Sequence, residues 1–289
     1  MRAAYFSANG TTRTITRTIA REAARQLETG CLDTDFTLPA SRTEPLRFDP
    51  GELIILGVWV SAGRIPNLLL PYLEKTRGCG APAVPVAVFG NRDYDDALIE
   101  MRDLLLRCGA VPVAAGAFVG EHSFSPLIAG GRPDRKDLDI AAGFGALVAE
   151  KVRDQKGTAE PVWVPGTKGS CRGYYQPLDP KGSPLSFLKA VPVTTDACID
   201  CKLCADICPM GAIDRNDVSS VPGKCIKCCA CIRRCPAGAK RFEDQGFLIH
   251  RAMLEKELKD PRVPEIYLAS GPSRLSPATG RNAARSNAE

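Results

Sequence analysis

Eight cysteines in the last third of the chain form two matching runs, and each run ends in Cys-Pro. The pattern Cys-x2-Cys-x2-Cys-x3-Cys-Pro spans Cys198 to Pro209 and recurs from Cys225 to Pro236. Two residues between thiolates let one tight loop bind three corners of an iron–sulfur cubane, so the fourth corner is filled from elsewhere. The two runs therefore predict two 4Fe-4S clusters.

The two predicted ligand sets exchange one cysteine. In a doubled run of this kind, the cysteine before the proline binds the other cluster. One set is then Cys198, Cys201, Cys204 and Cys235, and the other is Cys225, Cys228, Cys231 and Cys208. Zinc knuckles or a disulfide framework are the alternatives, but structural zinc takes two separated pairs of ligands, and no histidine lies near these runs.

Cys229 is a competing thiol between two predicted ligands. Alignment of the two runs matches Cys201 with Cys228 and places Cys229 opposite Lys202, which favours Cys228 as the ligand. The remaining cysteines share no spacing, and we expect them to be buried or unreactive thiols; they are Cys31, Cys79, Cys108 and Cys171.

The match between the runs continues beyond their cysteines, since residues 198–212 align with residues 225–239 throughout. The module resembles bacterial two-cluster ferredoxins over roughly residues 190–245. The resemblance implies that each half consists of a strand, a cluster loop and a short helical turn, with glycine and alanine packed close to the cubane.

Composition restricts the class of protein. A chain of 289 residues with 44% hydrophobic residues is long enough for two domains. No stretch approaches the roughly 20 apolar residues of a membrane span, and residues 1–10 do not resemble a signal peptide. Thiolate-bound clusters suit a reducing compartment, so we expect a cytoplasmic protein. A net charge of +5 is mild and does not indicate nucleic-acid binding.

The N-terminal half alternates short apolar runs with helical segments, which is typical of a doubly wound parallel sheet in an α/β domain. We expect five strands, the number found in flavodoxins, with a short or absent helix between Pro39 and Gly51. The expected strands are 3–6, 32–36, 53–59, 84–89 and 111–118, and the expected helices are 12–27, 65–76, 95–108 and 138–152.

The turn after the first strand is suited to binding a phosphate. It places hydroxyls, an amide and free backbone N–H groups at a positive helix terminus, in the order Ser7, Ala8, Asn9, Gly10, Thr11, Thr12. The turn resembles the flavodoxin phosphate loop, although Asn9 stands where that family usually has threonine. A capped helix behind a polar turn is the alternative.

Two further loops are expected to hold a flavin ring. Ligands of such sheets bind outside the carboxyl ends of the strands. After the third strand these residues are Trp59, Val60, Ser61 and Gly63, and after the fourth they are Gly90, Asn91 and Tyr94. Trp59 or Tyr94 could stack on the ring, although Trp59 is equally suited to core packing. The resemblance to flavodoxin implies that the flavin is FMN.

The whole chain resembles the flavodoxin–ferredoxin fusion family of bacterial electron-transfer proteins. Further segments that carry this resemblance are Gly63 to Pro66, Gly90 to Asp96, Gly120 to Ser123 and Pro264 to Leu268. The expected division is a flavodoxin-like FMN domain, a linker, a ferredoxin domain, a docking segment and a disordered tail. Their ranges are 1–153, 154–190, 191–245, 246–269 and 270–289.

Three functions remain open on these grounds. The first is an electron-transfer protein that couples FMN to the two clusters and delivers electrons to a partner redox protein, which is acidic if Arg233, Arg234, Lys240 and Arg241 form the docking face. The second is reduction of a small substrate at FMN, with His122 as the candidate proton donor. The third is a sensor without turnover. Solvated surface charge and a structural histidine are the simpler interpretations of these residues, and no oligomeric state is predicted.

Overall fold

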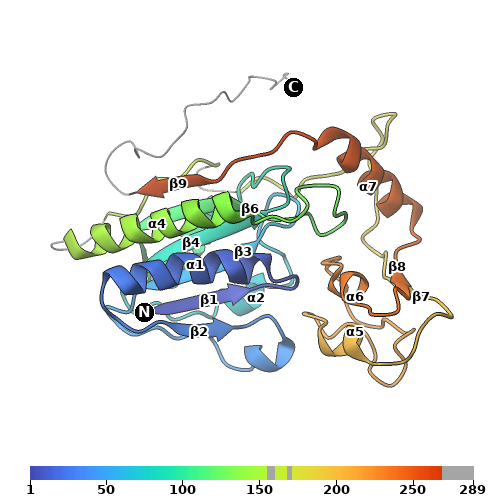
Figure 1. Ribbon diagram of the computed structural model, residues 1–289, viewed down its shortest axis with the longest axis horizontal. Coiled ribbons are helices and arrows are strands. Elements are labelled where there is room, and N and C mark those ends of the chain that lie inside the picture. The colour runs from blue at the N-terminus through green and yellow to red at the C-terminus, as the bar shows by residue number, and fades with distance from the viewer. Residues whose placement is uncertain (155–159, 168–170, 269–289) are drawn as a thin grey trace.

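The computed structural model describes residues 1–154, 160–167 and 171–268, and it places an α/β domain beside a small cysteine-rich domain (Figure 1). Five parallel strands run in the order β2-β1-β3-β4-β6. This is the 2-1-3-4-5 order of flavodoxin-like sheets. The strands are β1 (Arg2–Phe6), β2 (Leu32–Asp35), β3 (Ile54–Trp59), β4 (Pro82–Phe89) and β6 (Ala114–Val119).

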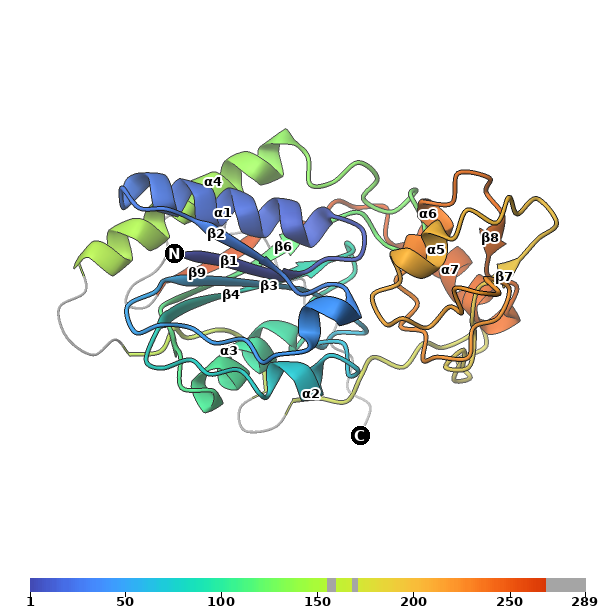
Figure 2. The same ribbon diagram turned by 90° about the horizontal axis from the view of Figure 1, so that it is seen from below.

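Helices cover both faces of the sheet (Figure 2). Helices α1 (Thr11–Gln26) and α4 (Arg135–Asp154) cover one face, and α2 (Leu70–Leu73) and α3 (Ala97–Arg107) cover the other. Ile15, Ile19 and Ala23 repeat every four residues along α1 and are fully buried, as the apolar stripe of a sheet-covering helix should be. The two helices on this face pack closely at Gly145, where a Cβ atom would lie 2.4 Å from the Ile19 carbonyl oxygen.

Proline explains where the predicted elements and the observed ones differ. The helix predicted over 65–76 is reduced to α2, because Pro71 in its first turn has no N–H with which to extend a helix from Ile65. The fifth predicted strand is divided into β5 (Val111–Pro112) and β6. The segment after Pro39 forms only the 3-10 helix η1 (Pro39–Arg42), as expected of a short crossover.

The C-terminal segment returns to the α/β domain. Helix α7 (Gln245–Glu257) lies in the cysteine-rich region, and β9 (Glu265–Leu268) then pairs antiparallel with β6 at the edge of the sheet. The predicted docking of an extended segment at 265–268 is therefore observed, and it adds an antiparallel edge to the parallel sheet. The predicted disordered tail lies outside the described residues.

The cysteine-rich domain repeats its backbone conformation as well as its sequence. It contains β7 (Val193–Thr194), α5 (Leu203–Asp206), α6 (Ala230–Arg233) and β8 (Lys240–Arg241), and β7 pairs with β8. Positive φ angles recur at the aligned positions Lys202 (62°) and Cys229 (58°), and at Gly211 (58°) and Gly238 (60°). The two halves therefore fold alike around their cysteines.

The segment between the two domains packs on the α/β domain along much of its length. Val162 and Val164 are buried in that domain's core. The Tyr174 hydroxyl donates to the Ile65 carbonyl, and the Tyr175 N–H donates to the Ala62 carbonyl. Within the described residues, no helix is both long and apolar enough to cross a membrane.

Asn91 fastens the segment between α7 and β9. Its side chain is 2% exposed, and its Nδ2 donates to the carbonyls of Leu258 (3.1 Å) and Asp260 (3.0 Å). Its Oδ1 accepts the Arg262 N–H at 2.8 Å. A short amide side chain also tolerates the positive φ of 64° at this position better than most residues.

We therefore expect Asn91→Ala to destabilise the protein by about 3 kcal/mol, because three hydrogen bonds made by a buried side chain are lost. Limited proteolysis should also cleave the 258–264 segment faster. Urea unfolding and a time course with trypsin measure the two effects. Asn67→Ala, at an exposed loop position, is the matched control and should leave both unchanged. Equal stability of the two variants would contradict this anchoring role.

Candidate functional site

Two cavities in the cysteine-rich domain are each lined by four of the predicted ligands. Cys198, Cys201, Cys204 and Cys235 line the first, here called the Cys198 cavity. Cys208, Cys225, Cys228 and Cys231 line the second, here called the Cys225 cavity. Each cavity takes three cysteines from one run and the fourth from the other, so the arrangement supports the predicted exchange of ligands.

Backbone N–H groups point at equivalent sulfurs in the two halves. The Asp200 N–H donates to Cys198 Sγ, and the Lys227 N–H donates to Cys225 Sγ, both at 3.4 Å. The Ala212 and Ala239 N–H groups donate in the same way to Cys208 Sγ (3.2 Å) and Cys235 Sγ (3.3 Å). Such bonds stabilise thiolate ligands and help to set a cluster's reduction potential.

The thiols of the Cys225 cavity are buried more deeply than those of the Cys198 cavity. Burial raises the pKa of Cys231 to about 12, and it also raises the pKa of Cys225 and Cys228. Without metal these thiols are therefore protonated at neutral pH. Iron, when bound, supplies the positive charge that stabilises the thiolates, and its binding releases protons. The donor set fits 4Fe-4S clusters.

Cys229 also lines the Cys225 cavity, but it is held by contacts of its own. It is 5% exposed and packs in an apolar cluster with Ala190, Phe242 and Phe247. Its Sγ donates to the Lys227 carbonyl at 3.5 Å. Because Cys229 begins α6 with the same positive φ that Lys202 has before α5, the backbone supports the alignment that leaves Cys228 as the ligand.

We therefore expect Cys229→Ala to keep both clusters, at on the order of eight irons per chain. Cys228→Ala should hold about half of that iron or less, since it removes a ligand. Iron and sulfide determination on anaerobically purified protein measures both. The assignment would be reversed if the Cys229 variant lost iron and the Cys228 variant kept it.

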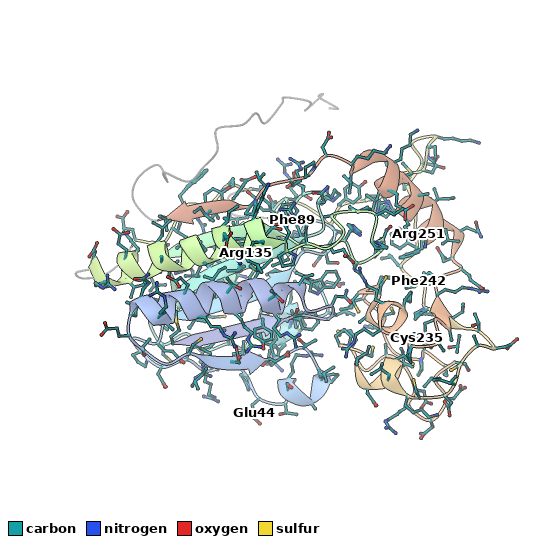
Figure 3. The ribbon with its side chains drawn as sticks, viewed as in Figure 1. Glu44, Phe89, Arg135, Cys235, Phe242 and Arg251 are labelled. Carbon is teal, nitrogen blue, oxygen red and sulfur yellow. The ribbon has the colours of Figure 1, made fainter. Side chains whose placement is uncertain are left out.

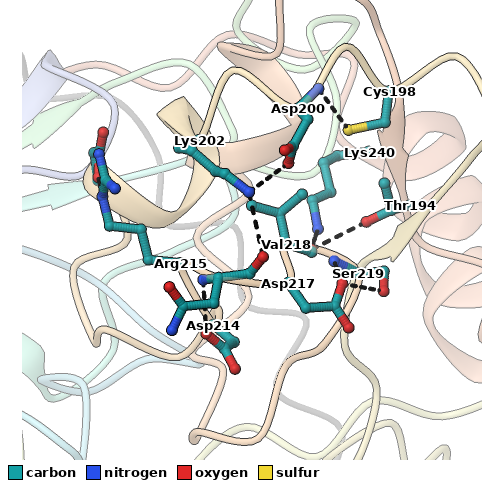
Figure 4. Close-up of polar contacts among 12 residues, drawn as sticks. Thr194, Cys198, Asp200, Lys202, Asp214, Arg215, Asp217, Val218, Ser219 and Lys240 are labelled. Carbon is teal, nitrogen blue, oxygen red and sulfur yellow. Dashed lines mark hydrogen bonds and ion pairs between the residues drawn. The ribbon is translucent and has the colours of Figure 1, made fainter.

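The four basic residues predicted to form a docking face differ in their surroundings. Lys240 is 3% exposed, and its Nζ donates to the Val218 carbonyl beside the Cys198 loop (Figure 4). Arg233 forms an ion pair with Glu121 of the α/β domain, and Arg241 pairs with Glu243. Arg234 remains exposed. Three of the four charges therefore have acceptors within the chain, and the basic docking face stays a prediction.

A third cavity lies between the two domains. Residues that follow the first, third, fourth and sixth strands line it together with one residue of the cysteine-rich domain, and it encloses about 480 Å³, part of which is open to solvent. The lining residues are Ala8, Asn9, Thr11, Thr12, Trp59, Val60, Val88, Phe89, Gly90, Gly120, Glu121, His122, Ser123 and Cys228.

Two buried polar atoms of this interdomain cavity have no hydrogen-bond partner among the described residues. They are Asn9 Oδ1 and Trp59 Nε1. A buried polar group without a partner costs free energy, so these atoms point to a ligand that hydrogen-bonds them. Gly90 lets His122 pack closely against the backbone after β4, because a Cβ on Gly90 would lie 2.9 Å from His122 Cα. One acceptor and one donor of this kind suit the polar edge of a flavin ring.

Some of the predicted flavin residues lie elsewhere. The Ser7 hydroxyl accepts the Arg13 N–H in the first turn of α1, and Gly10 precedes α1 with a φ of 89°. Ser61 pairs with Arg64 through backbone hydrogen bonds, and a Cβ on Gly63 would collide with Asp95. None of these four residues lines the cavity.

Tyr94 and Asn91 are also held away from the cavity. Tyr94 packs on Phe89, and its hydroxyl donates to the Glu265 carboxylate (2.7 Å) and shares a hydrogen bond with the Tyr267 hydroxyl (2.8 Å). Asn91 binds the C-terminal segment. Of the two predicted stacking residues, only Trp59 therefore reaches the cavity. The lining also includes Gly120 and Ser123, which the sequence argument missed although they follow the last parallel strand and obey the carboxyl-end rule.

His122 lines the cavity in its neutral form. Its Nδ1 accepts the Phe124 N–H at 3.1 Å, which leaves Nε2 to carry the proton. Burial, with contributions from the positive charges of His250 and Arg92, lowers the pKa of His122 to about 4. His122 can therefore donate a hydrogen bond near neutral pH, but it is poorly suited to deliver a proton, which weakens the reductase hypothesis.

The lowered pKa also predicts a pH dependence of stability. The unfolded chain binds a proton at His122 near pH 6.5, whereas the folded chain does so near pH 4, so stability falls as pH drops through this window. Between pH 7 and 5.5 we expect His122 to account for about 1 kcal/mol of that loss. Urea unfolding of the parent and of His122→Gln at both pH values measures it. An unchanged pH slope in the variant would contradict the lowered pKa.

A protein family and a curated protein have sequences similar to parts of this chain. Residues 190–241 match a family described as a 4Fe-4S dicluster domain. Over 80 residues the chain is 38% identical to 2-succinyl-5-enolpyruvyl-6-hydroxy-3-cyclohexene-1-carboxylate synthase from Synechocystis. That segment is 27% of this chain and 13% of the enzyme, so the chain spans only a small part of this relative.

Solved structures similar to the N-terminal half include flavodoxins. An archaeal flavodoxin is 18% identical, with a TM-score of 0.37 over 53% of this chain and 99% of its own. Flavodoxin 1 from Bacillus cereus is also 18% identical, with a TM-score of 0.36 over 54% and 98%. A WrbA-like protein from Agrobacterium tumefaciens is 17% identical, with a TM-score of 0.35 over 54% and 98%. The flavodoxin-like fold of this domain rests on the order of its parallel strands.

A flavodoxin-like α/β domain and a 4Fe-4S dicluster domain in one chain define an electron-transfer protein. The chain therefore joins a flavodoxin-like α/β domain to a 4Fe-4S dicluster domain.

Proposed function

We propose that this protein binds FMN in the interdomain cavity and one 4Fe-4S cluster in each cysteine cavity, and that it passes electrons to a partner redox protein. The observation that carries the proposal is the position of Cys228, which lines both the interdomain cavity and the Cys225 cavity. A flavin and a cluster at these sites would share one wall.

The chemistry supplied by these groups is complementary, because FMN exchanges one or two electrons and each cluster exchanges one. The protein would bind the flavin and the two clusters in three separate cavities. Thr11 and Thr12 open α1 at the edge of the cavity, and their N–H groups suit the terminal phosphate of FMN. Trp59 offers its indole N–H, and neutral His122 offers Nε2–H.

Several predicted residues keep a supporting role in this proposal. The Ser7 hydroxyl fixes the first turn of α1, and Gly10 supplies the left-handed conformation that lets the chain enter the helix. The proposed domain ranges remain 1–153, 154–190, 191–245 and 246–269, with Asp244 capping α7 through its bond to the Phe247 N–H near the last boundary.

Gly90→Ala and Gly143→Ala form a matched pair that tests this function. The added methyl at Gly90 lies 2.9 Å from His122 Cα, whereas nothing lies within 4 Å of it at Gly143 on α4. We expect Gly90→Ala to weaken FMN binding about tenfold or more, which is about 1.4 kcal/mol. Gly143→Ala should bind FMN like the parent.

The measurements are a fluorescence titration with FMN and iron determination under anaerobic conditions. Both variants should keep on the order of eight irons per chain, because neither touches a cysteine cavity. A parent protein without affinity for FMN, or one that holds zinc and no inorganic sulfide, would refute the proposal.

A further inference from the structure

The two halves of the cysteine-rich domain are alike in sequence but not in position. Figure 3 shows Phe89, the last residue of β4, at the end of the sheet that faces this domain, and it shows Cys235 and Phe242 within the domain. The parallel strands therefore direct their carboxyl ends, and with them the interdomain cavity, toward the cysteines.

Contacts with the α/β domain come from residues around the Cys225 cavity. The Asn9 Nδ2 atom donates to the Cys228 carbonyl at 2.7 Å, and Arg42 Nη2 donates to the Pro209 carbonyl at 2.5 Å. Met210 and Ile226 pack against the core of the α/β domain. All four residues of the cysteine-rich domain in these contacts line the Cys225 cavity.

The opposite side of the module is turned to solvent. Cys201 is exposed, and Ile199, which lines the Cys198 cavity beside it, is 66% exposed. The Lys202 side chain bonds within this half of the domain. Its Nζ donates to the Asp200 carboxylate at 2.7 Å and to the Asn216 carbonyl at 3.3 Å (Figure 4). No described residue that lines the Cys198 cavity also lines the interdomain cavity.

Resting on the function proposed above, we infer that electrons move in a fixed order, from the flavin to the cluster in the Cys225 cavity and then to the cluster in the Cys198 cavity. Each transfer moves one electron and no atom: the donor is oxidised by one electron and the acceptor is reduced by one. Two such transfers fully oxidise a flavin that carries two electrons. The exposed Cys198 cluster is then the site from which electrons leave.

The same contacts make Asn9 a positioning residue for this path. Asn9 lines the interdomain cavity, its Nδ2 donates to the Cys228 carbonyl, and its Oδ1 is buried with no hydrogen-bond partner among the described residues. One short side chain thereby joins the backbone that carries a cluster ligand to the site that faces the flavin.

Cys198→Ser and Cys225→Ser form a matched pair, since the two cysteines occupy aligned positions and accept equivalent N–H bonds at 3.4 Å. Each variant is designed to lose the cluster on its own run. Flash photoreduction of bound FMN, followed by absorbance of the remaining cluster, measures the first transfer. We expect a parental rate in Cys198→Ser and a rate lower by about tenfold or more in Cys225→Ser.

A readout that needs no turnover is the electron paramagnetic resonance spectrum of the chemically reduced cluster with and without added FMN. The spectrum should respond to FMN in Cys198→Ser, where the neighbouring cluster remains, and not in Cys225→Ser. The reverse pattern, or equal photoreduction rates in the two variants, would overturn the order. A parent that binds both kinds of cofactor and never exchanges electrons between them would instead overturn the proposed function.

Asn9→Asp and Asn216→Asp keep all cysteines and therefore test the order even if a ligand variant loses both clusters. Each adds one negative charge, the first at the Cys228 carbonyl and the second at the exposed loop of the Cys198 half. At saturating FMN, Asn9→Asp should slow the first transfer about tenfold or more with unchanged iron content. Asn216→Asp should match the parent. Equal rates in the two variants would count against Asn9 and the order alike.

Discussion

The contact between the carboxyl edge of the parallel sheet and the second cysteine loop is the constraint on which the rest of the structure depends. It is formed by the Asn9 bond to the Cys228 carbonyl and the ion pair of Arg233 with Glu121. Phe124, two residues after His122, also packs on Phe247 of α7, with ring centroids 4.6 Å apart. Because apolar, ionic and hydrogen-bonding contacts coincide here, the interdomain cavity has walls from both domains.

Local sequence patterns were sufficient for the elements that form by themselves. Alternating apolar runs predicted the parallel strands and α1, α3 and α4, since burial of one stripe or one face decides these elements. The cysteine spacing likewise predicted the two groups of four thiols, because loop geometry at that spacing leaves few alternatives. The turn after the first strand was predicted from its polar groups at a helix N-terminus, and four of its residues line the cavity: Ala8, Asn9, Thr11 and Thr12.

Tertiary contacts decided what those patterns missed. Asn91 and Tyr94 follow a strand, as flavin-binding residues should, but the returning C-terminal segment takes their polar atoms. Lys240 belongs to a basic cluster in the sequence, yet its Nζ is buried against the Val218 carbonyl. Neither outcome has a local signature, because the partner lies 22 residues away for Lys240 and 167 for the Asn91 bond to Leu258.

The two halves of the duplicated cysteine-rich domain differ in what surrounds them. Its two cysteine loops share ligand spacing, N–H···S bonds and backbone conformation, so the loops alone would give two clusters with similar properties. Solvent exposure and nearby hydrogen bonds also set the potential of a cluster. The Cys225 cavity is covered by the α/β domain, whereas Cys201 of the Cys198 cavity is exposed. For clusters bound as proposed, packing against the α/β domain therefore makes the two halves inequivalent. The cluster in the Cys225 cavity would lie next to the flavin, and the cluster in the Cys198 cavity would lie next to solvent.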